Sequence, residues 1–384
     1  MNRKIGIYIH IPFCLSKCYY CDFVSFTNQK EDMIEKYIDA LCQEILQNID
    51  ILSNCDIQSI YFGGGTPSFI DSKYITKILD ILSLCIEDKS KVEITIEANP
   101  NSITDLKLQD YVKSGINRIS IGLQSTHDDI LKKVGRAHNY QDFLESLKLC
   151  RNNNIKNISI DLIYPLPGLN IKRFNETLNT VMELKDEYNI KHISIYNLEL
   201  HENTKLDFLV KQGYETLVDE DEEMQMKRLL ESTLASNGFI NYEISNFALK
   251  GYESKHNLNY WNQGEYLGFG VNASSFYGGL RYTNTDNLAE YINNISNGMD
   301  IIKQKDSLDK LDLMKEYVIL KLRLKNGFNE DTFKNRFKQD VESLFKPNID
   351  KMIDLALLEK DQNKNIYLTP KGKDLANIVW EEFI

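Results

Sequence analysis

Three cysteines near the amino end of the chain are spaced so that they could hold a metal cluster. Cys14, Cys18 and Cys21 form the pattern C-x-x-x-C-x-x-C. Soft thiolate ligands favour iron–sulfur clusters over hard cations, and three of them on one short loop can reach three corners of a [4Fe-4S] cube. The alternative is a zinc knuckle, which needs a fourth ligand nearby, and His10 is the candidate for it. We predict a [4Fe-4S] cluster whose fourth iron is open to an exogenous ligand.

A glycine-rich stretch follows the next predicted strand. Gly63, Gly64, Gly65 and Thr66 stand in sequence before a proline. Triple glycine by itself is usually only a turn. Beside a cluster loop it gains meaning, because missing side chains let backbone amides and carbonyls approach the charged end of a small molecule. We therefore predict that this stretch lines a binding site.

Polar side chains also stand near the carboxyl ends of three predicted strands. Glu97, Gln124 and Asp161 occupy these positions, and Arg136 follows the strand that ends near Gln124. Strand ends meet at one mouth in a barrel, so ligand groups should converge there. Carboxylates and amides can hold hydroxyls or an ammonium group, and a guanidinium can pair with a carboxylate in a bidentate fork. Taken singly, each residue could equally make a rim hydrogen bond or a surface ion pair.

A histidine beside two large aromatic residues forms a separate candidate site. His256, Tyr260 and Trp261 lie in the segment His-Asn-Leu-Asn-Tyr-Trp. Such a histidine can ligate a haem iron or simply pack beneath a loop. The residues alone leave both interpretations open.

Strands alternate with helices in the first half of the chain, and these elements must position the candidate residues. The expected strands cover residues 5–11, 57–62, 92–98, 117–123, 155–164 and 192–197. Amphipathic helices are expected over residues 33–46, 74–86 and 104–113. Strands separated by helices imply parallel pairing with right-handed crossovers. Six such units are too few for a closed eight-fold barrel, so we predict an α/β fold with a partial, open (β/α)6 TIM-like barrel.

The pattern changes in the second half. Residues 220–237 predict an acidic amphipathic helix, and residues 242–276 are rich in Asn, Gly and aromatic residues, which favours a site-building segment. From residue 307 the pattern indicates helices, a short strand over 365–369 and a helix over 371–383, an order typical of a winged-helix-like domain. We predict a barrel domain over 1–235, a connecting segment with the candidate haem site over 236–304, and a mainly helical winged-helix-like domain over 305–384.

Composition excludes several classes of protein. Hydrophobic residues make up 42% and aromatic residues 10% of the 384 residues, which excludes disorder as the main state. The net charge of −11 argues against gripping nucleic acid, and the C-terminal domain carries as many basic as acidic residues. RNA modification is therefore not expected. Seven cysteines do not resemble a secreted disulfide framework, and no apolar run approaches the ~20 residues of a membrane helix, so we expect a cytoplasmic protein.

The cysteine pattern after the first strand resembles the radical S-adenosylmethionine (SAM) superfamily. Seven segments, which span essentially the whole chain, resemble oxygen-independent coproporphyrinogen III oxidase and, within that group, the HemW-type haem chaperones. They are Ile7–Cys14, Phe62–Ser68, Ile121–Gln124, Gly135–Arg136, Asp161–Gly168, Tyr242–Ala248 and His256–Trp261. The resemblance implies that the open iron binds the amino and carboxylate groups of SAM and that an electron cleaves the sulfonium to a 5′-deoxyadenosyl radical.

The resemblance also assigns roles to residues. It places the SAM amino group on the Gly63–Gly65 backbone, and Arg136 could pair with the SAM carboxylate. Tyr8 and Tyr20 would bracket the cluster and the adenine region. It strengthens the haem interpretation of His256, although Ser274 stands where many chaperone-type members carry a histidine, so one candidate axial ligand is absent.

Two functions from different classes compete. The oxidase carries a further cysteine two places after the third, where this chain has Phe23, and it has a long arm where only thirteen residues precede Cys14. Residues 242–261 also match the chaperone-type pattern better. We therefore predict a haem chaperone that carries haem as cargo to respiratory membrane proteins, with coproporphyrinogen III oxidase as the alternative and enzyme activity left open. The resemblance further implies a homodimer and a peripheral location at the inner face of the membrane.

Overall fold

Six parallel strands form the centre of the protein in the computed structural model, which describes residues 3–384. They pair in chain order, each with the next. Their bounds are β1 Arg3–Ile11, β4 Cys55–Gly64, β5 Glu93–Ala98, β6 Arg118–Gln124, β7 Ile158–Tyr164 and β8 Ile190–Asn197. Every expected strand is therefore confirmed, and so is the partial (β/α)6 barrel.

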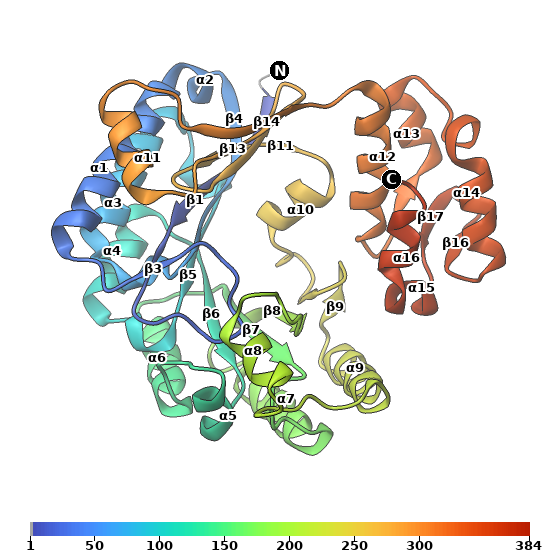
Figure 1. Cartoon of the computed structure of the whole chain (residues 1–384), viewed down its shortest axis with the longest axis horizontal. Coiled ribbons are helices and arrows are strands. Elements are labelled where there is room, and N and C mark those ends of the chain that lie inside the picture. Colours follow the sequence, from blue (N-terminus) through green and yellow to red (C-terminus); the bar gives the residue numbers. More distant parts are fainter. Residues whose placement is uncertain (1–2) are drawn as a thin grey trace.

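Helices cover the outer face of this curved sheet, and its inner face is open toward α10 (Figure 1). Each parallel strand returns through at least one helix, as a right-handed crossover requires. The helices of this part of the chain are α1 Glu31–Gln47, α2 Ile49–Ser53, α3 Ser72–Leu82, α4 Asp105–Ser114, α5 Asp128–Lys133, α6 Tyr140–Asn152, α7 Ile171–Leu184, α8 Lys205–Lys211 and α9 Glu220–Ser236. The three helices expected at 33–46, 74–86 and 104–113 are α1, α3 and α4, although α3 ends at Leu82 and a 3-10 turn follows.

Strand β1 illustrates why the two faces differ. Its odd residues from Ile5 to Ile11 are isoleucines with no exposed surface, and they join the main hydrophobic core. Tyr8 and His10 alternate with them on the opposite face, because successive side chains in a strand point to opposite sides. The Tyr37 hydroxyl of α1 donates a 2.7 Å hydrogen bond to the His10 carbonyl oxygen. The strand is thus fixed by apolar packing outside and presents polar groups inside.

Residues 236–304 extend the sheet at both edges. At one edge β11 pairs in parallel with β1, followed by three antiparallel strands, and at the other β8 is followed by two short antiparallel strands. These elements are β9 Ile240–Asn241, β10 Asn246–Ala248, α10 Lys255–Trp261, β11 Glu265–Phe269, β12 Ser274–Tyr277, β13 Leu280–Asn284, α11 Leu288–Ser296 and β14 Ile302–Ser307. Their short, half-polar sequences gave no strand signal. The domain boundaries at residues 235 and 304 stay predictions.

The C-terminal residues form a second hydrophobic core of their own. A three-stranded antiparallel sheet, ordered β15-β17-β16, packs with helices, as the winged-helix-like expectation requires. Its elements are α12 Lys310–Leu322, β15 Phe328–Asn329, α13 Glu330–Phe337, α14 Glu342–Asp354, β16 Leu358–Lys360, β17 Asn365–Leu368, α15 Pro370–Asp374 and α16 Ala376–Glu381. The single helix expected over 371–383 is therefore two short ones, because Leu375 leaves the helical conformation with φ −117°.

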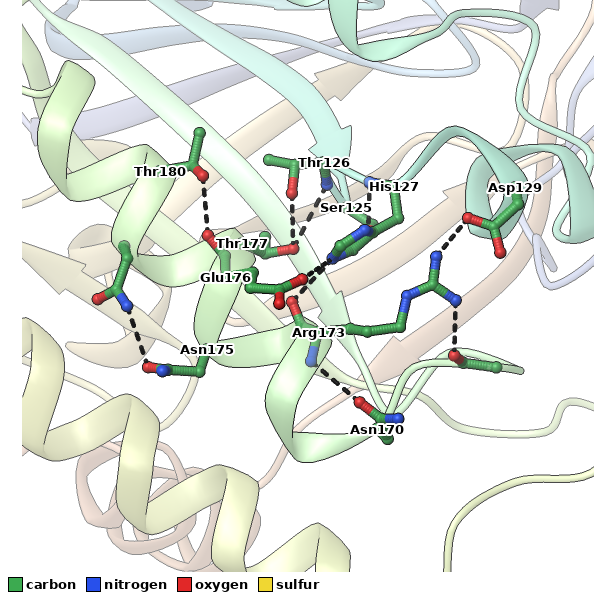
Figure 2. A network of polar contacts seen from close by, with 12 residues as sticks. Ser125, Thr126, His127, Asp129, Asn170, Arg173, Asn175, Glu176, Thr177 and Thr180 are labelled. Atoms are coloured by element: carbon green, nitrogen blue, oxygen red, sulfur yellow. Dashed lines mark hydrogen bonds and ion pairs between the residues drawn. The ribbon is translucent and has the colours of Figure 1, made fainter.

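A network of polar contacts anchors the loop after β6 to helix α7 (Figure 2). The hydroxyl oxygens of Thr126 and Thr177 lie 2.9 Å apart, and His127 Nε2 lies 3.0 Å from the Arg173 carbonyl oxygen. These contacts fix the start of α5 against α7. Since Arg136 follows α5 directly, they also limit where its guanidinium can reach. Within residues 3–384, no helix is long and apolar enough to cross a bilayer.

Candidate active site

The three cysteines lie on a loop that leaves the mouth of the barrel after β1. Cys14 ends β2 (Phe13–Cys14), which pairs with β3 (Phe26–Thr27) and closes the loop. Two backbone hydrogen bonds fix the middle of the loop at Tyr19. The Tyr19 N–H donates to the Val134 carbonyl at 3.0 Å, and the Tyr19 carbonyl accepts from the Leu206 N–H at 2.7 Å. The loop is therefore held against α5 on one side and α8 on the other.

The thiols suit a cluster better than a single zinc ion. Burial raises the pKa of the Cys14 thiol, and burial raises that of Cys21 to about 11, so thiolates here need a bound cation to offset their charge. His10, the fourth ligand that zinc would require, has its Nδ1 3.0 Å from the Tyr8 hydroxyl and its Nε2 3.2 Å from the Val24 carbonyl. Within residues 3–384, no three His, Cys, Asp or Glu side chains are spaced to share one metal ion. A cube places each thiolate on a different iron.

A chain of hydrogen bonds connects the Cys14 sulfur to the Cys18 sulfur. Thr66 Oγ1 donates to Cys14 Sγ at 3.6 Å, and Asn99 Nδ2 donates to Thr66 Oγ1 at 2.9 Å. Arg136 completes the chain of contacts. Its Nη2 donates to Asn99 Oδ1 at 2.5 Å, and its Nη1 donates to Cys18 Sγ at 3.5 Å. Donors aimed at both sulfurs stabilise thiolates and orient cluster ligands. This hydrogen-bond chain thus joins the cysteine loop to the ends of β4, β5 and β6.

The glycine stretch allows two close backbone approaches. A Cβ on Gly65 would lie 2.9 Å from the Phe13 carbonyl oxygen and 3.0 Å from Cys14 Sγ. A Cβ on Gly63 would lie 3.1 Å from the Tyr8 ring and 3.3 Å from the Glu97 carboxyl carbon. The stretch therefore lies between the cysteine loop and the polar inner face of the barrel, and its bare backbone can serve a ligand that touches both.

Two buried polar atoms beside this hydrogen-bond chain have no partner within residues 3–384. Gln124 sits at a bulge with φ +68°, which is strained for a residue other than glycine. Its Oε1 and the Nε of Arg136 are buried and have no hydrogen-bond partner among the described residues. Such groups are normally satisfied by a ligand or by water. A polar molecule such as SAM fits this donor and acceptor set.

Two buried acids lie on the inner face of the barrel. Glu97 accepts a 2.8 Å hydrogen bond from the Tyr61 hydroxyl. The single Ser120 hydroxyl donates to Asp161 and lies 3.0 and 3.1 Å from its two carboxylate oxygens. Burial raises the pKa of Glu97 to about 7 and also raises that of Asp161. Near neutral pH, Glu97 can therefore bind a ligand's hydroxyl groups in either protonation state, and a ligand cation would favour its ionised form.

The two tyrosines predicted to bracket the cofactors occupy different places. Tyr20 lies near Arg136 and the cysteines, and burial raises its pKa. Tyr8 lies on the inner wall of the barrel, with its ring centroid 6.5 Å from that of Tyr61. Tyr20 is thus close to the cysteines, whereas Tyr8 lies between the glycine stretch and the aromatic region described next.

The predicted haem residues lie on α10, which fills the open side of the barrel (Figure 1). The ring of His256 is buried, with Nδ1 2.8 Å from Ser59 Oγ and Nε2 2.8 Å from the Tyr260 hydroxyl. Burial lowers the pKa of His256 to about 3, so the ring is neutral. Glu93 accepts from the His256 backbone N–H at 3.2 Å. Both ring nitrogens are thus engaged in this conformation, and iron ligation by His256 stays a prediction.

Tyr260 and Trp261 face a cavity of about 560 Å³ between the barrel mouth and the C-terminal unit. The cavity also meets the cysteine loop, since Phe23 lines it with 64% of its surface exposed. Ser274, which stands where many chaperone-type members carry a histidine, lies on the same wall and contacts Thr283. The volume is in the range of pockets for small molecules and cofactors.

Sequence reasoning missed three residues of this region. Asn99 is the middle member of the hydrogen-bond chain between the two cysteines. It follows the end of β5, so the rule that selected Glu97, a polar residue near a strand end, could also have selected Asn99. Tyr61 and Ser59 belong to the strand whose end was recognised only by its glycines. No local signal marks them, because their roles come from contacts with residues far along the chain.

Comparisons with known proteins agree with this architecture. Residues 8–181 match the family model described as Radical SAM superfamily, and residues 308–375 match the HemN C-terminal domain. The chain is 35% identical over 386 residues to the heme chaperone HemW of Lactococcus lactis, covering 100% of this chain and 98% of the relative. It is 32% identical over 378 residues to that of Bacillus subtilis, covering 98% of each. Coproporphyrinogen III oxidase (HemN) from Escherichia coli shares the fold, with a TM-score of 0.86 at 23% identity over 100% of this chain and 90% of that one.

Gly65→Ala tests the close approach of the glycine stretch to the cysteine loop. The new Cβ would meet the Phe13 carbonyl and displace Cys14, so the iron content of anaerobically reconstituted protein should fall severalfold. Gly251→Ala is the control, because nothing lies within 4 Å of an added Cβ there. Gly251 has a φ of +86°, whereas Gly65 has no positive φ, so the control carries backbone strain without a steric clash. Equal iron content in the two variants would contradict the proposed close approach.

Glu97→Gln should change how stability depends on pH. The ordinary pKa of 4.5 is raised to about 7 in the folded chain, so folding is opposed increasingly as pH rises from 4.5 to 7 and by a constant amount above that. Glutamine can still accept from Tyr61 without carrying charge. We expect the variant to gain about 1–2 kcal/mol at pH 7.5 but not at pH 4.5, measured by urea unfolding of the cofactor-free protein. A gain that is the same at both pH values would contradict the burial argument.

Proposed function

The chain belongs to the heme chaperone HemW family of radical SAM proteins, and from this we propose that it binds haem as cargo and transfers it to an acceptor protein. The observation that carries the proposal is the cavity that Tyr260 and Trp261 share with Phe23 of the cysteine loop. A pocket of this size with aromatic walls suits a planar macrocycle. Cargo bound there would lie next to the cofactor site, because the cavity meets the cysteine loop.

Two cofactors belong to the proposal. Cys14, Cys18 and Cys21 would hold a [4Fe-4S] cluster, while the backbone of Gly63–Gly65 and the side chain of Arg136 would hold SAM. When bound, the cluster supplies an electron to the sulfonium of SAM. The unpaired Gln124 Oε1 and the buried Glu97 carboxyl support a second set of contacts to the ribose and amino groups. Asp161 and Tyr8 line the same inner face of the barrel.

The residues of α10 would form one wall of the haem site. His256 is held between Ser59 and Tyr260 by 2.8 Å contacts, so its ring fixes the orientation of Tyr260. Trp261 is held from the other side, because the Arg323 guanidinium lies 4.3 Å from its ring centroid. Both aromatic side chains are therefore preorganised, which lowers the entropy cost of binding a rigid ligand.

The acceptor and the setting extend the proposal further. We infer that the acceptors are haem-requiring respiratory membrane proteins, that the chain forms a homodimer, and that it works in the cytoplasm at the inner face of the membrane. The names of the full-length relatives support haem transfer in general. Nucleic acid is not among the proposed partners, in keeping with the net charge of −11.

The oxidase alternative is weakened by the charge of the cavity. Coproporphyrinogen III carries four propionates, and an enzyme that binds it should present several cations. Among the described residues that line the cavity, Arg281 is the one arginine, with no lysine beside it. Haem carries two propionates, which this charge suits better.

Cys18→Ala and Cys42→Ala form a matched pair for the cluster. Cys42 is a buried thiol of α1 in the hydrophobic core, so its loss should leave the brown absorbance and the iron content unchanged. Cys18→Ala should abolish both. Metal analysis of anaerobically prepared protein reads the result, and zinc in place of iron would contradict the cluster.

His256→Ala and His192→Ala form a matched pair for haem. His192 is equally buried, with Ser159 Oγ and the Tyr242 hydroxyl each 2.8 Å from its ring nitrogens. Its partner Tyr242 does not line the cavity, whereas Tyr260, the partner of His256, does. We expect His256→Ala to shift the Soret band and weaken haem binding about tenfold, whereas His192→Ala should lower stability alone. Haem titration followed by absorbance measures both effects.

Two results would contradict the proposed function. An unchanged Soret band in His256→Ala would show that this residue neither ligates nor supports the haem. Formation of protoporphyrinogen from coproporphyrinogen III, with SAM and a reductant under anaerobic conditions, would instead assign the oxidase reaction.

A further inference from the structure

The cavity beside α10 is lined by aromatic rings on one side and by a charged pair at one end. This difference indicates which parts of a ligand each region would bind. On one side, α10 contributes the rings of Tyr260 and Trp261, and strands β11 and β12 contribute those of Tyr266 and Phe276. Tyr260 and Tyr266 pack edge to face with centroids 4.6 Å apart, and Tyr266 and Phe276 lie 6.5 Å apart. These rings form a continuous aromatic surface against which a flat ligand can lie.

A single arginine stands at the end of this surface. Arg281 of β13 lies with its guanidinium 5.3 Å from the Phe276 ring centroid and is one-third exposed. Its Nη1 forms a 2.5 Å ion pair with Glu316 Oε1 of α12, on the other side of the cavity. The arginine is therefore positioned by the aromatic wall and neutralised by an acid that reaches across from the C-terminal unit.

We propose that Arg281 is the carboxylate anchor of this cavity and binds a haem propionate in exchange for Glu316. The inference rests on the proposed function and names the residue that recognises the cargo. A propionate and the Glu316 carboxylate have the same chemistry, so the fork of donors that now faces Glu316 suits the ligand equally well. The exchange swaps one ion pair for another and transfers no proton or electron.

Glu316 has a second partner that can retain it after the exchange. Gln263 Nε2 donates to Glu316 Oε2 at 2.9 Å, and Arg336 Nη2 donates to the Gln263 carbonyl at 3.0 Å. The C-terminal unit therefore stays docked on the barrel when Arg281 changes partner. Because these contacts do not involve Arg281, replacing Arg281 should leave the C-terminal unit docked.

Arg281→Met tests the anchor, since methionine keeps much of the length and apolar contact with Phe276 but has no charge. Arg151→Met is the control, because Arg151 of α6 forms a similar 2.6 Å ion pair with Glu187 and does not line the cavity. Each variant is titrated with haem, with haem dimethyl ester, whose propionates are uncharged, and with iron-free protoporphyrin IX. Glu316→Gln is titrated with the same three ligands.

We expect Arg281→Met to weaken haem and protoporphyrin IX about tenfold and to leave the ester unchanged. Glu316→Gln should strengthen the two acids severalfold, because their competitor is lost, and Arg151→Met should match the wild type. The anchor would be overturned if Arg281→Met bound haem normally, or if it weakened the ester as much as the acid, since that pattern reports packing instead of charge.

Failure of the proposed function gives a different pattern. If the wild type bound protoporphyrin IX through Arg281 but did not bind haem, the anchor would stand and the haem cargo would be wrong. If the wild type bound neither tetrapyrrole, both would be wrong. Because all four proteins carry their C-terminal unit intact, circular dichroism of each one checks that folding does not explain the difference.

Discussion

The chain of hydrogen bonds from the Cys14 sulfur to the Cys18 sulfur is the interaction on which the site depends. Thr66, Asn99 and Arg136 come from the ends of three successive strand units, yet each bonds with the next. The parallel sheet makes this closure possible, because it brings the carboxyl ends of its strands to one edge. A cluster bound to these thiols would therefore sense the position of the whole barrel mouth.

A polar interior is the cost of placing this site inside a barrel. Buried acids and histidines are favoured only when each finds a partner, and the interior supplies them in repeated form. His192 lies between a serine and a tyrosine, and His256 is held in the same way on the other side of the barrel. The two arrangements are alike in their contacts but differ in their surroundings, since Tyr260 lines the cavity and Tyr242 does not. The surroundings, and not the histidine itself, distinguish a candidate binding residue from a structural one.

The C-terminal unit belongs to the site as much as the barrel does. It has its own hydrophobic core, but it reaches the cavity through Glu316 and grips Trp261 through Arg323. Polar contacts across such an interface can exchange partners more readily than a packed apolar interface can. A cavity between two units is consequently suited to cargo that must enter and leave.

The sequence alone determined the features that are local. The cysteine spacing, the glycine stretch and the six strand units can all be recognised within short windows, because hydrophobic periodicity and loop chemistry act between near neighbours. Glu97, Gln124, Asp161 and Arg136 could be placed near one mouth because strand ends in such a barrel converge. The tertiary structure alone decided the rest. It paired β11 with β1 and placed Asn99 between Thr66 and Arg136. It also brought hydrogen-bond partners to both ring nitrogens of His256 and set Arg281 opposite Glu316. Each of these contacts joins residues that are distant in the chain, so its geometry is fixed by how the elements pack and leaves no mark in either local sequence.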